Sequence, residues 1–494
     1  MRILKSLVLC LLLSTVALPQ GKPIFERQSD LEFGGAEETV VAHKFVEGEN
    51  KLVLVGRKVV RVLDVASGKF SESRPVDVPE FNEDRPREFS PDGRFMLVFG
   101  NYDSEKKEDK VKRPPTVWDL RTGKQVATLD KTREPIRAGF WSKNGRTLAT
   151  SSAERAPNLA LGSSVEVSFW DGETFEYRNS LPTDRAAWWR LTEDGEKCIF
   201  STGEVIKRGI SVISFKYVSP GGPVSVWDIK GAKVERTISA RGGRAEWEIR
   251  FNNLSPDERF LTMVVQPPKS KDAERRLAVW EIDRSHAAGP EAKPKYEVKP
   301  PAKIAEYGPS FSPDGKYFAL QAGKNLQIHE TRTGEKRFEL TNFDRPGFWL
   351  TDDILYTTYR SRMEAFDFAT GKLLYELKLI YKANSYLEDY PDSNPLGSAD
   401  YPKRAVTEVL DETKIAVHPS GRMFLTHSKQ YVQIFDSRAG ALLQTLVEPP
   451  VDNTKKKPKT SDEPLVSTAD WSADGRVLYV ISADKRRVSL WRLA

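Results

Sequence analysis

The feature of this chain that most constrains its fold is a unit of turn and strand signals that recurs along its whole length. Residues 311–340 hold the plainest copy, which opens with Ser312-Pro313-Asp314-Gly315 and closes with a Thr333-Gly334 turn before a last short run. Ser-Pro-Asp-Gly suits a type I turn, because proline presets φ at the first central position and glycine accepts the positive φ that follows. The runs between and after the two turns have the composition of short strands.

Versions of the first turn stand at nine places in the chain. They lie at 47–50, 90–93, 142–145, 192–195, 255–258, 312–315, 351–353, 419–421 and 472–475. The run that follows each turn, such as 95–99 or 477–481, is apolar enough for a strand buried on both faces. Four short strands per unit, at a mean period of roughly 50 residues, predict the blades of a β-propeller. We therefore expect an all-β fold with a single propeller of eight or nine four-stranded blades.

The second half of each unit ends on an aromatic or bulky residue, often followed by an acid, as in Trp118-Asp119 and Trp227-Asp228. A glycine turn such as Thr122-Gly123-Lys124 often comes next. In these motifs, residues from about 40 to 494 resemble the WD40-like propellers, including the bacterial exported kind. The resemblance implies the fold and says little about function. The Gly-His pair that opens a standard WD40 repeat is absent, so the buried His–Ser–Asp–Trp network of that family is not carried over.

The two ends of the chain predict how the ring closes. The last unit stops at Ala494 after its third strand, and residues 24–33 precede the first complete unit. If this N-terminal segment supplies the missing fourth strand, no sheet edge is left exposed. We therefore predict one propeller over residues 21–494, closed by an N-terminal strand.

Residues 1–20 read as a secretory signal peptide. Arg2 and Lys5 precede an apolar run at 6–17, and Thr15-Val16-Ala17 offers small residues for cleavage. The run is too short to span a bilayer. Only Cys198 would remain after processing, which excludes an intrachain disulfide. We expect a secreted or periplasmic monomer without a transmembrane segment.

Charge and motifs point away from several functional classes. The formal charge of +6 falls to +4 when Arg2 and Lys5 leave with the signal peptide, which is too weak to indicate nucleic acid. The sequence contains no His-Glu-x-x-His, Cys-x-x-Cys-His or Gly-x-Ser-x-Gly motif and no phosphate-binding loop. We therefore assign no catalytic residue, metal ligand or cofactor. His329 takes the tryptophan position of its unit and reads as a packed core histidine, and Cys198 reads as a small apolar filler.

Long insertions indicate which face of the propeller binds. In a four-stranded blade, the first-to-second and third-to-fourth turns share one face, and the other connections share the opposite face. Six insertions fall in the second class: 101–115, 152–163, 203–222, 266–275, 381–406 and 449–465. One exception, 284–295, joins a third strand to a fourth. Long loops gathered on one face of a rigid scaffold favour a binding face there.

The insertion that starts at residue 381 holds the predicted contact site. Its members are Tyr381, Tyr386, Tyr390, Tyr401, Asp389 and Asp392. Tyrosine offers a large rigid contact area at low entropy cost, and the acids favour a basic or hydroxyl-rich partner. The alternative is that the tyrosines pack the loop onto its own blade. We expect a protein partner, with a polysaccharide or cell-envelope polymer as the second class, and no nucleic acid.

These features together predict an exported scaffold for protein–protein or ligand binding. The alternative is a propeller hydrolase or lyase that acts on a polymer, for which two carboxylates must face each other in the central pocket. The sequence does not place such a pair, and a propeller supports either function.

Overall fold

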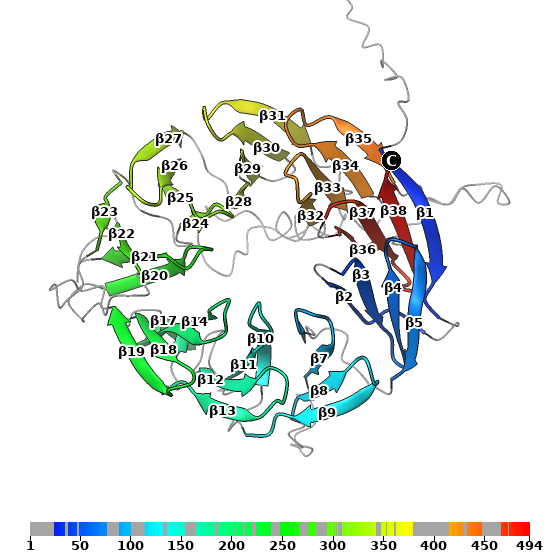
Figure 1. Ribbon diagram of the computed structural model, residues 1–494. Coiled ribbons are helices and arrows are strands. Elements are labelled where there is room, and N and C mark those ends of the chain that lie inside the picture. The colour runs from blue at the N-terminus through cyan, green and yellow to red at the C-terminus, as the bar shows by residue number, and fades with distance from the viewer. Residues whose placement is uncertain are drawn as a thin grey trace, which may run out of the picture.

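The computed structural model describes the propeller strands and most of their tight turns. The described residues are 24–34, 38–46, 49–76, 88–99, 114–131, 136–153, 165–182, 186–202, 204–210, 213–219, 224–238, 248–266, 275–282, 294–300, 302, 304, 309–341, 347–351, 353–359, 362–378, 414–427, 432–446, 466–472 and 474–494. Within these residues every regular element is a β-strand. The strands form nine four-stranded antiparallel sheets arranged as the blades of a ring (Figure 1).

The first three blades follow the chain in order, with the first strand of each toward the centre of the ring. Blade 1 consists of β2 (Ala42–Val46), β3 (Lys51–Val55), β4 (Val59–Asp64) and β5 (Lys69–Pro75). Blade 2 consists of β6 (Glu88–Phe89), β7 (Phe95–Val98), β8 (Thr116–Asp119) and β9 (Lys124–Thr128). Blade 3 consists of β10 (Ile136–Trp141), β11 (Thr147–Ala153), β12 (Val165–Asp171) and β13 (Tyr177–Ser180).

The next three blades repeat this order, with one addition. Blade 4 consists of β14 (Ala186–Leu191), β15 (Lys197–Thr202), β18 (Val224–Asp228) and β19 (Lys233–Ile238). Blade 5 consists of β20 (Glu248–Leu254), β21 (Phe260–Gln266), β22 (Arg276–Glu281) and β23 (Tyr296–Val298). Blade 6 consists of β24 (Ser310–Phe311), β25 (Tyr317–Ala322), β26 (Asn325–Glu330) and β27 (Lys336–Leu340). Between the second and third strands of blade 4, β16 (Glu204–Ile210) and β17 (Ile213–Ser219) form a separate hairpin, where the sequence predicted only a long loop.

The last three blades include the one that joins the chain ends. Blade 7 consists of β28 (Gly347–Leu350), β29 (Ile354–Tyr359), β30 (Arg362–Asp367) and β31 (Leu373–Lys378). Blade 8 consists of β32 (Lys414–Val417), β33 (Met423–His427), β34 (Val432–Asp436) and β35 (Leu442–Thr445). Blade 9 consists of β36 (Val466–Trp471), β37 (Val477–Ser482) and β38 (Arg487–Leu493), completed by β1 (Phe25–Glu32).

Blade 9 confirms the predicted closure. Strand β1 pairs antiparallel with β38 from Phe25 opposite Leu493 to Glu32 opposite Arg487. In Figure 1 the blue N-terminal strand accordingly lies beside the dark red C-terminal strand. The blade count, left at eight or nine by the sequence, is nine.

One cluster of buried apolar side chains lies at each interface between neighbouring blades. Between blades 1 and 2, for example, Val53 packs with Met96 and Trp118. Between blades 9 and 1, Leu54 packs with Leu490. Because the interface between the last and first blades has a core of its own, the ring is continuous.

Candidate binding site

The predicted tyrosine site lies outside the described residues. Tyr381, Tyr386, Asp389, Tyr390, Asp392 and Tyr401 all fall in the segment between β31 and β32. The strands at its two ends show what the segment connects. It leaves the outer strand of blade 7 and returns to the inner strand of blade 8, as the sequence predicted.

The strand order confirms the predicted difference between the two faces. Connections from first to second strand and from third to fourth strand are tight turns in blades 1 to 4 and 6 to 8. The six long insertions join second to third strands or one blade to the next, and 284–295 joins β22 to β23 as the predicted exception. We call the first side the tight-turn face and the opposite side the long-segment face.

The Ser-Pro-Asp-Gly motif builds a rigid tight-turn face. In blade 6 the Ser312 hydroxyl donates to Asp314 Oδ1 at 2.7 Å, and Asp314 Oδ1 accepts the Lys316 N–H at 3.0 Å. The same hydroxyl accepts the Tyr317 N–H at 3.0 Å. Burial opposes ionisation of Asp314, but hydrogen bonds from Lys316 and Ser312 outweigh it and lower the pKa of the carboxyl group. The turn therefore holds its own polar groups and needs no partner.

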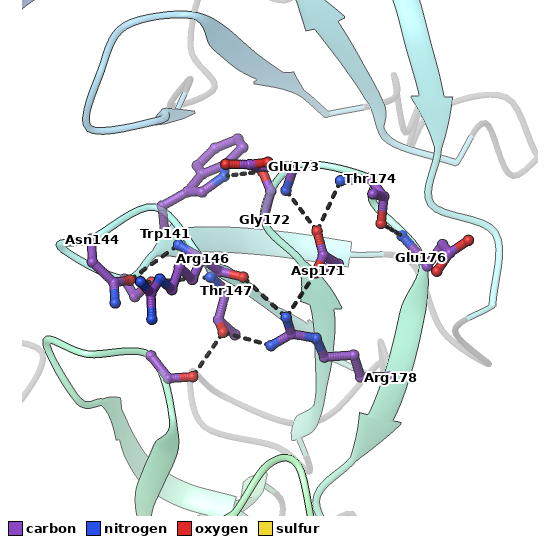
Figure 2. A network of polar contacts seen from close by, with 12 residues as sticks. Trp141, Asn144, Arg146, Thr147, Asp171, Gly172, Glu173, Thr174, Glu176 and Arg178 are labelled. Carbon is purple, nitrogen blue, oxygen red and sulfur yellow. Dashed lines mark hydrogen bonds and ion pairs between the residues drawn. The ribbon is translucent and has the colours of Figure 1, made fainter.

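Blade 3 shows the most connected version of this face (Figure 2). Arg178 on the outer strand donates to Asp171 Oδ2 at 2.8 Å and to the hydroxyl of Thr147 at 2.9 Å. Thr147 in turn donates to the carbonyl of Gly195 in blade 4 at 2.7 Å. Burial opposes ionisation of Asp171, but hydrogen bonds from the backbone N–H groups of Thr174 and Glu173 and from Arg178 lower its pKa. One arginine thus ties two strands of its blade to the next blade.

A second tie between blades uses one repeated outer-strand position. This latch position pairs with the residue two places before the acid that ends the third strand in blades 1 to 8, or two places before Arg492, which takes the place of the acid in blade 9. Its occupants are Glu72, Ala127, Asn179, Arg236, Tyr296, Phe338, Tyr375, Gln444 and, in blade 9, Ser29. Asn179, Tyr296 and Tyr375 donate to the next blade at the carbonyl that follows its terminal acid, on Ile229, Thr331 and Ser437 respectively. Gln444 donates instead to the Phe25 carbonyl of blade 9.

The tyrosine latches also explain two turn glycines. A Cβ on Gly334 would lie 2.5 Å from the Tyr296 ring, and one on Gly440 would lie 2.4 Å from the Tyr375 ring. Both glycines also have positive φ, at 78° and 63°. Burial raises the pKa of both tyrosine hydroxyls, so they remain protonated donors. Each ring therefore closes its blade interface with both packing and a hydrogen bond.

One of the interfaces without a tyrosine latch contains a cavity. The cavity lies between blades 1 and 2 on the tight-turn face and has a volume of about 70 Å³. Its floor is apolar and is formed by Val46, Val53, Val60, Val62 and Leu120. Its rim is charged but internally paired, since Glu72 pairs with Arg74, and Lys51 pairs with Glu49. Sequence reasoning missed this site, because a latch residue is recognised only from the strand register.

His329 and Cys198 behave as structural residues. His329 is buried, stacks on Phe318 at 5.1 Å between ring centroids and makes a 2.9 Å hydrogen bond with the carbonyl of Gly334. Burial lowers its pKa, so the neutral ring is favoured and the prediction of a packed histidine is confirmed. Cys198 is fully buried, and desolvation raises the pKa of its thiol, which confirms an apolar filler. Among the described residues, no cluster of histidine, cysteine and acidic side chains could hold a metal ion.

Comparison with known proteins adds information about the fold. A scan against protein-family models and a search of curated proteins both found no match. Among solved structures, the C-terminal WD40 domain of Sif2 is 10% identical, covers 96% of this chain and 99% of its own, and has a TM-score of 0.43. A eukaryotic initiation factor is 12% identical, covers 84% of this chain and 89% of its own, and has a TM-score of 0.50. At these identities the likeness extends to the fold alone, and the described strands form a nine-bladed β-propeller.

Proposed function

We propose that this chain is an exported scaffold that holds a protein partner on its long-segment face. The observation that supports this most directly is the placement of the long insertions. Six of them begin and end on that face, whereas the tight-turn face is made largely of short hydrogen-bonded turns. Because recognition residues gather on loops held by a rigid framework, the long-segment face suits a binding role.

The described strands provide the rigid framework that such a role needs. Each blade interface has its own buried apolar cluster, and several interfaces add a hydrogen bond between blades. A closed ring fixes the points from which the long segments leave. The scaffold itself then loses little ordering entropy on binding.

The chemistry of the partner follows from the segment that contains Tyr386 and Tyr390. Four tyrosines among small polar residues and aspartates favour a partner that presents basic or hydroxyl groups. A protein is the first such class, and a polysaccharide or cell-envelope polymer is the second. A monomer suffices for this role.

A paired-variant capture experiment tests the assigned face. Tyr386→Ala with Tyr390→Ala should abolish partner capture from the native envelope, with little change in melting temperature. The matched control is Lys124→Ala with Lys372→Ala, which alters two exposed positions on the tight-turn face and should capture normally. Loss of capture in the control alone would place the partner on the tight-turn face and contradict the proposal. A sharp fall in Tm with capture retained would make the tyrosine segment structural.

Export has its own measurement. The signal-peptide reading expects cleavage between Ala17 and Gly21, so mass spectrometry of the mature protein should find its first residue there. An intact Met1 end on the mature protein would contradict export by this route. Incubation with candidate polymers separates the alternative function, because a hydrolase or lyase would shorten them and a scaffold would leave them unchanged.

Among the residues that the structure places, no helix is long and apolar enough to cross a membrane.

A further inference from the structure

The cavity between blades 1 and 2 lies on the face opposite the proposed partner face. It is lined by first-to-second turn residues of blades 1 and 2, including Glu49 and Gly93, and by third-to-fourth turn residues of blade 2, including Leu120 and Arg121. At about 70 Å³ it is far smaller than a pocket for a drug-sized ligand, which takes at least about 300 Å³. Its size suits one side chain of a larger molecule.

At three other interfaces an aromatic latch residue packs against the next blade. Between blades 5 and 6 it is the phenol of Tyr296, and between blades 7 and 8 it is the phenol of Tyr375, whose hydroxyl lies 2.8 Å from the Ser437 carbonyl. Between blades 6 and 7 it is Phe338, whose ring packs against Phe368 with centroids 5.8 Å apart. Aromatic rings thus fill three of the interfaces.

Between blades 1 and 2 the latch residue is Glu72, which can neither fill the space nor supply the donor. Its carboxylate pairs with Arg74 on its own strand. Leu120 holds the place that Thr331 and Ser437 hold in their blades, since the N–H of each donates to the residue just before the second strand. Leu120 is only 2% exposed, and no described residue donates a hydrogen bond to its carbonyl. A buried carbonyl without a donor is costly, so an incoming donor is favoured there.

We propose that this cavity receives a single tyrosine side chain from a partner protein. The phenol ring lies on the valine floor, and its hydroxyl donates to the Leu120 carbonyl. Tyr296 and Tyr375 donate in the same way to the carbonyls of Thr331 and Ser437. The rim carries four cationic side chains, Lys51, Arg74, Arg94 and Arg121, against three acids, so its charge balance disfavours a cationic side chain, and a guanidinium group can stack on an aromatic ring. The site is separate from the long-segment face, so either proposal can fail without the other.

Binding of blocked amino acids to the full chain tests the proposal. By ligand-observed NMR, N-acetyl-tyrosinamide should bind with a Kd on the order of 1 mM, as expected of so small a ligand. N-acetyl-phenylalaninamide should bind about fivefold more weakly, because it leaves the carbonyl unsatisfied. N-acetyl-argininamide should bind more weakly still. Equal binding of the tyrosine and phenylalanine probes, preferential binding of the arginine probe, or no binding of the tyrosine probe at 10-fold that concentration (about 10 mM) would each overturn the proposal.

A filling variant provides the second measurement. Glu72→Tyr installs at blade 1 the latch residue found in blades 5 and 7, so it should abolish binding of the tyrosine probe and raise the Tm. The matched control is Arg337→Tyr, which places a tyrosine at an exposed outer-strand position of blade 6 and should leave probe binding intact. If Glu72→Tyr folds with an unchanged or higher Tm and still binds the probe, the cavity is not the site.

Discussion

Blade 9 and the other eight blades share one strand order but are held together differently. The eight are each built from one continuous stretch of chain, so their outer strands reach the third strand through a local connection. The outer strand of blade 9 comes from the opposite end of the chain and reaches its place without such a connection. Side chains therefore have to supply the positioning that short turns supply elsewhere.

The clearest of these side chains is Gln444 in blade 8. Its amide accepts the Phe25 N–H at 2.8 Å and donates to the Phe25 carbonyl at 2.7 Å. Phe25 itself is fully buried, with its ring 5.4 Å from that of Trp471. The latch residue of blade 8 thus binds the N–H and the carbonyl of the first residue of β1, and not the carbonyl that follows the third strand of the next blade.

The charges at the end of the third strand are also reversed in blade 9. The other eight third strands end in an acid: Asp64, Asp119, Asp171, Asp228, Glu281, Glu330, Asp367 and Asp436. Lysine lies opposite that acid in several of them, as with Asp119 and Lys124. In blade 9, Arg492 takes the place of the acid, and Glu26 on β1 lies opposite. Like charges directly opposite each other destabilise a pair of strands. Glu26 therefore suits Arg492 in blade 9, whereas in any other blade it would lie opposite an acid.

Of the changes that separate blade 9 from the other blades, removing β1 should lower stability the most. Deletion of residues 21–34 exposes the edge of β38 and strips Phe25 and Phe33 from the clusters on both sides of blade 9. We expect the melting temperature to fall by several degrees or more, because the loss of a strand and two buried rings exceeds the few kcal/mol lost when a single core ring is truncated. A protein that lacks only residues 1–20 is the control and should melt normally. Equal melting of the two proteins would show that closure contributes no stability.

Truncating the anchor residue should cost somewhat less. Phe25→Ala removes a fully buried ring, so chemical denaturation should show a loss of about 3–5 kcal/mol. Leu442→Ala, at a 45% exposed position on the outer strand of blade 8, should cost less than about 0.5 kcal/mol. A comparable loss in both variants would mean that Phe25 is not an anchor.

Removing the Gln444 side chain, which clamps the backbone of Phe25, should lower stability moderately. Gln444→Ala deletes two hydrogen bonds and leaves the Phe25 backbone groups without partners, which costs about 1–3 kcal/mol. Gln125→Ala in blade 2 removes only a hydrogen bond to the Thr128 side chain and should be nearly neutral. Limited proteolysis should show faster cutting near residue 25 in the Gln444 variant alone. Identical cutting of the two variants would argue against a clamp.

Reversing single charges should have the smallest effect, and a double-mutant cycle should reveal it. Arg492→Glu or Glu26→Arg alone places like charges opposite each other and should cost about 0.2–1 kcal/mol. The double variant restores opposite charges and should recover most of that loss. Additive losses in the double variant would show that the two residues do not interact.

The sequence was a good guide to the ring because its turns carry local signals. Ser312-Pro313-Asp314-Gly315 and its copies mark where strands begin, and residues 24–33 were correctly predicted to provide the closing strand. The blade count stayed open because nine recurring units exceed the four to eight blades that are usual in a propeller, so that one unit could have been degenerate. The hairpin of β16 and β17 was not predicted, because residues 203–222 were classed as a long loop between two strands of the blade.

The cavity could not be predicted, for a physical reason. It depends on the placement of Glu72 in one blade beside Leu120 in the next. A bulge that shifts the register between Val62 and Leu63 sets the position of Glu72 on its strand. A slip of one residue in that register would turn Glu72 to the other side of the sheet. In the printed sequence Glu72 sits between two serines and resembles any residue of an exposed strand.

Ring closure also constrains the order of events during biosynthesis. The hydrogen bond from Ser489 to Asp30 joins residues 459 positions apart, so β1 leaves the ribosome long before the strand with which it pairs. At roughly 5–20 residues per second, β1 waits about 25–90 s for its partner. Throughout that interval the nascent chain carries an unpaired strand, and the ring closes only after β38 has been synthesised.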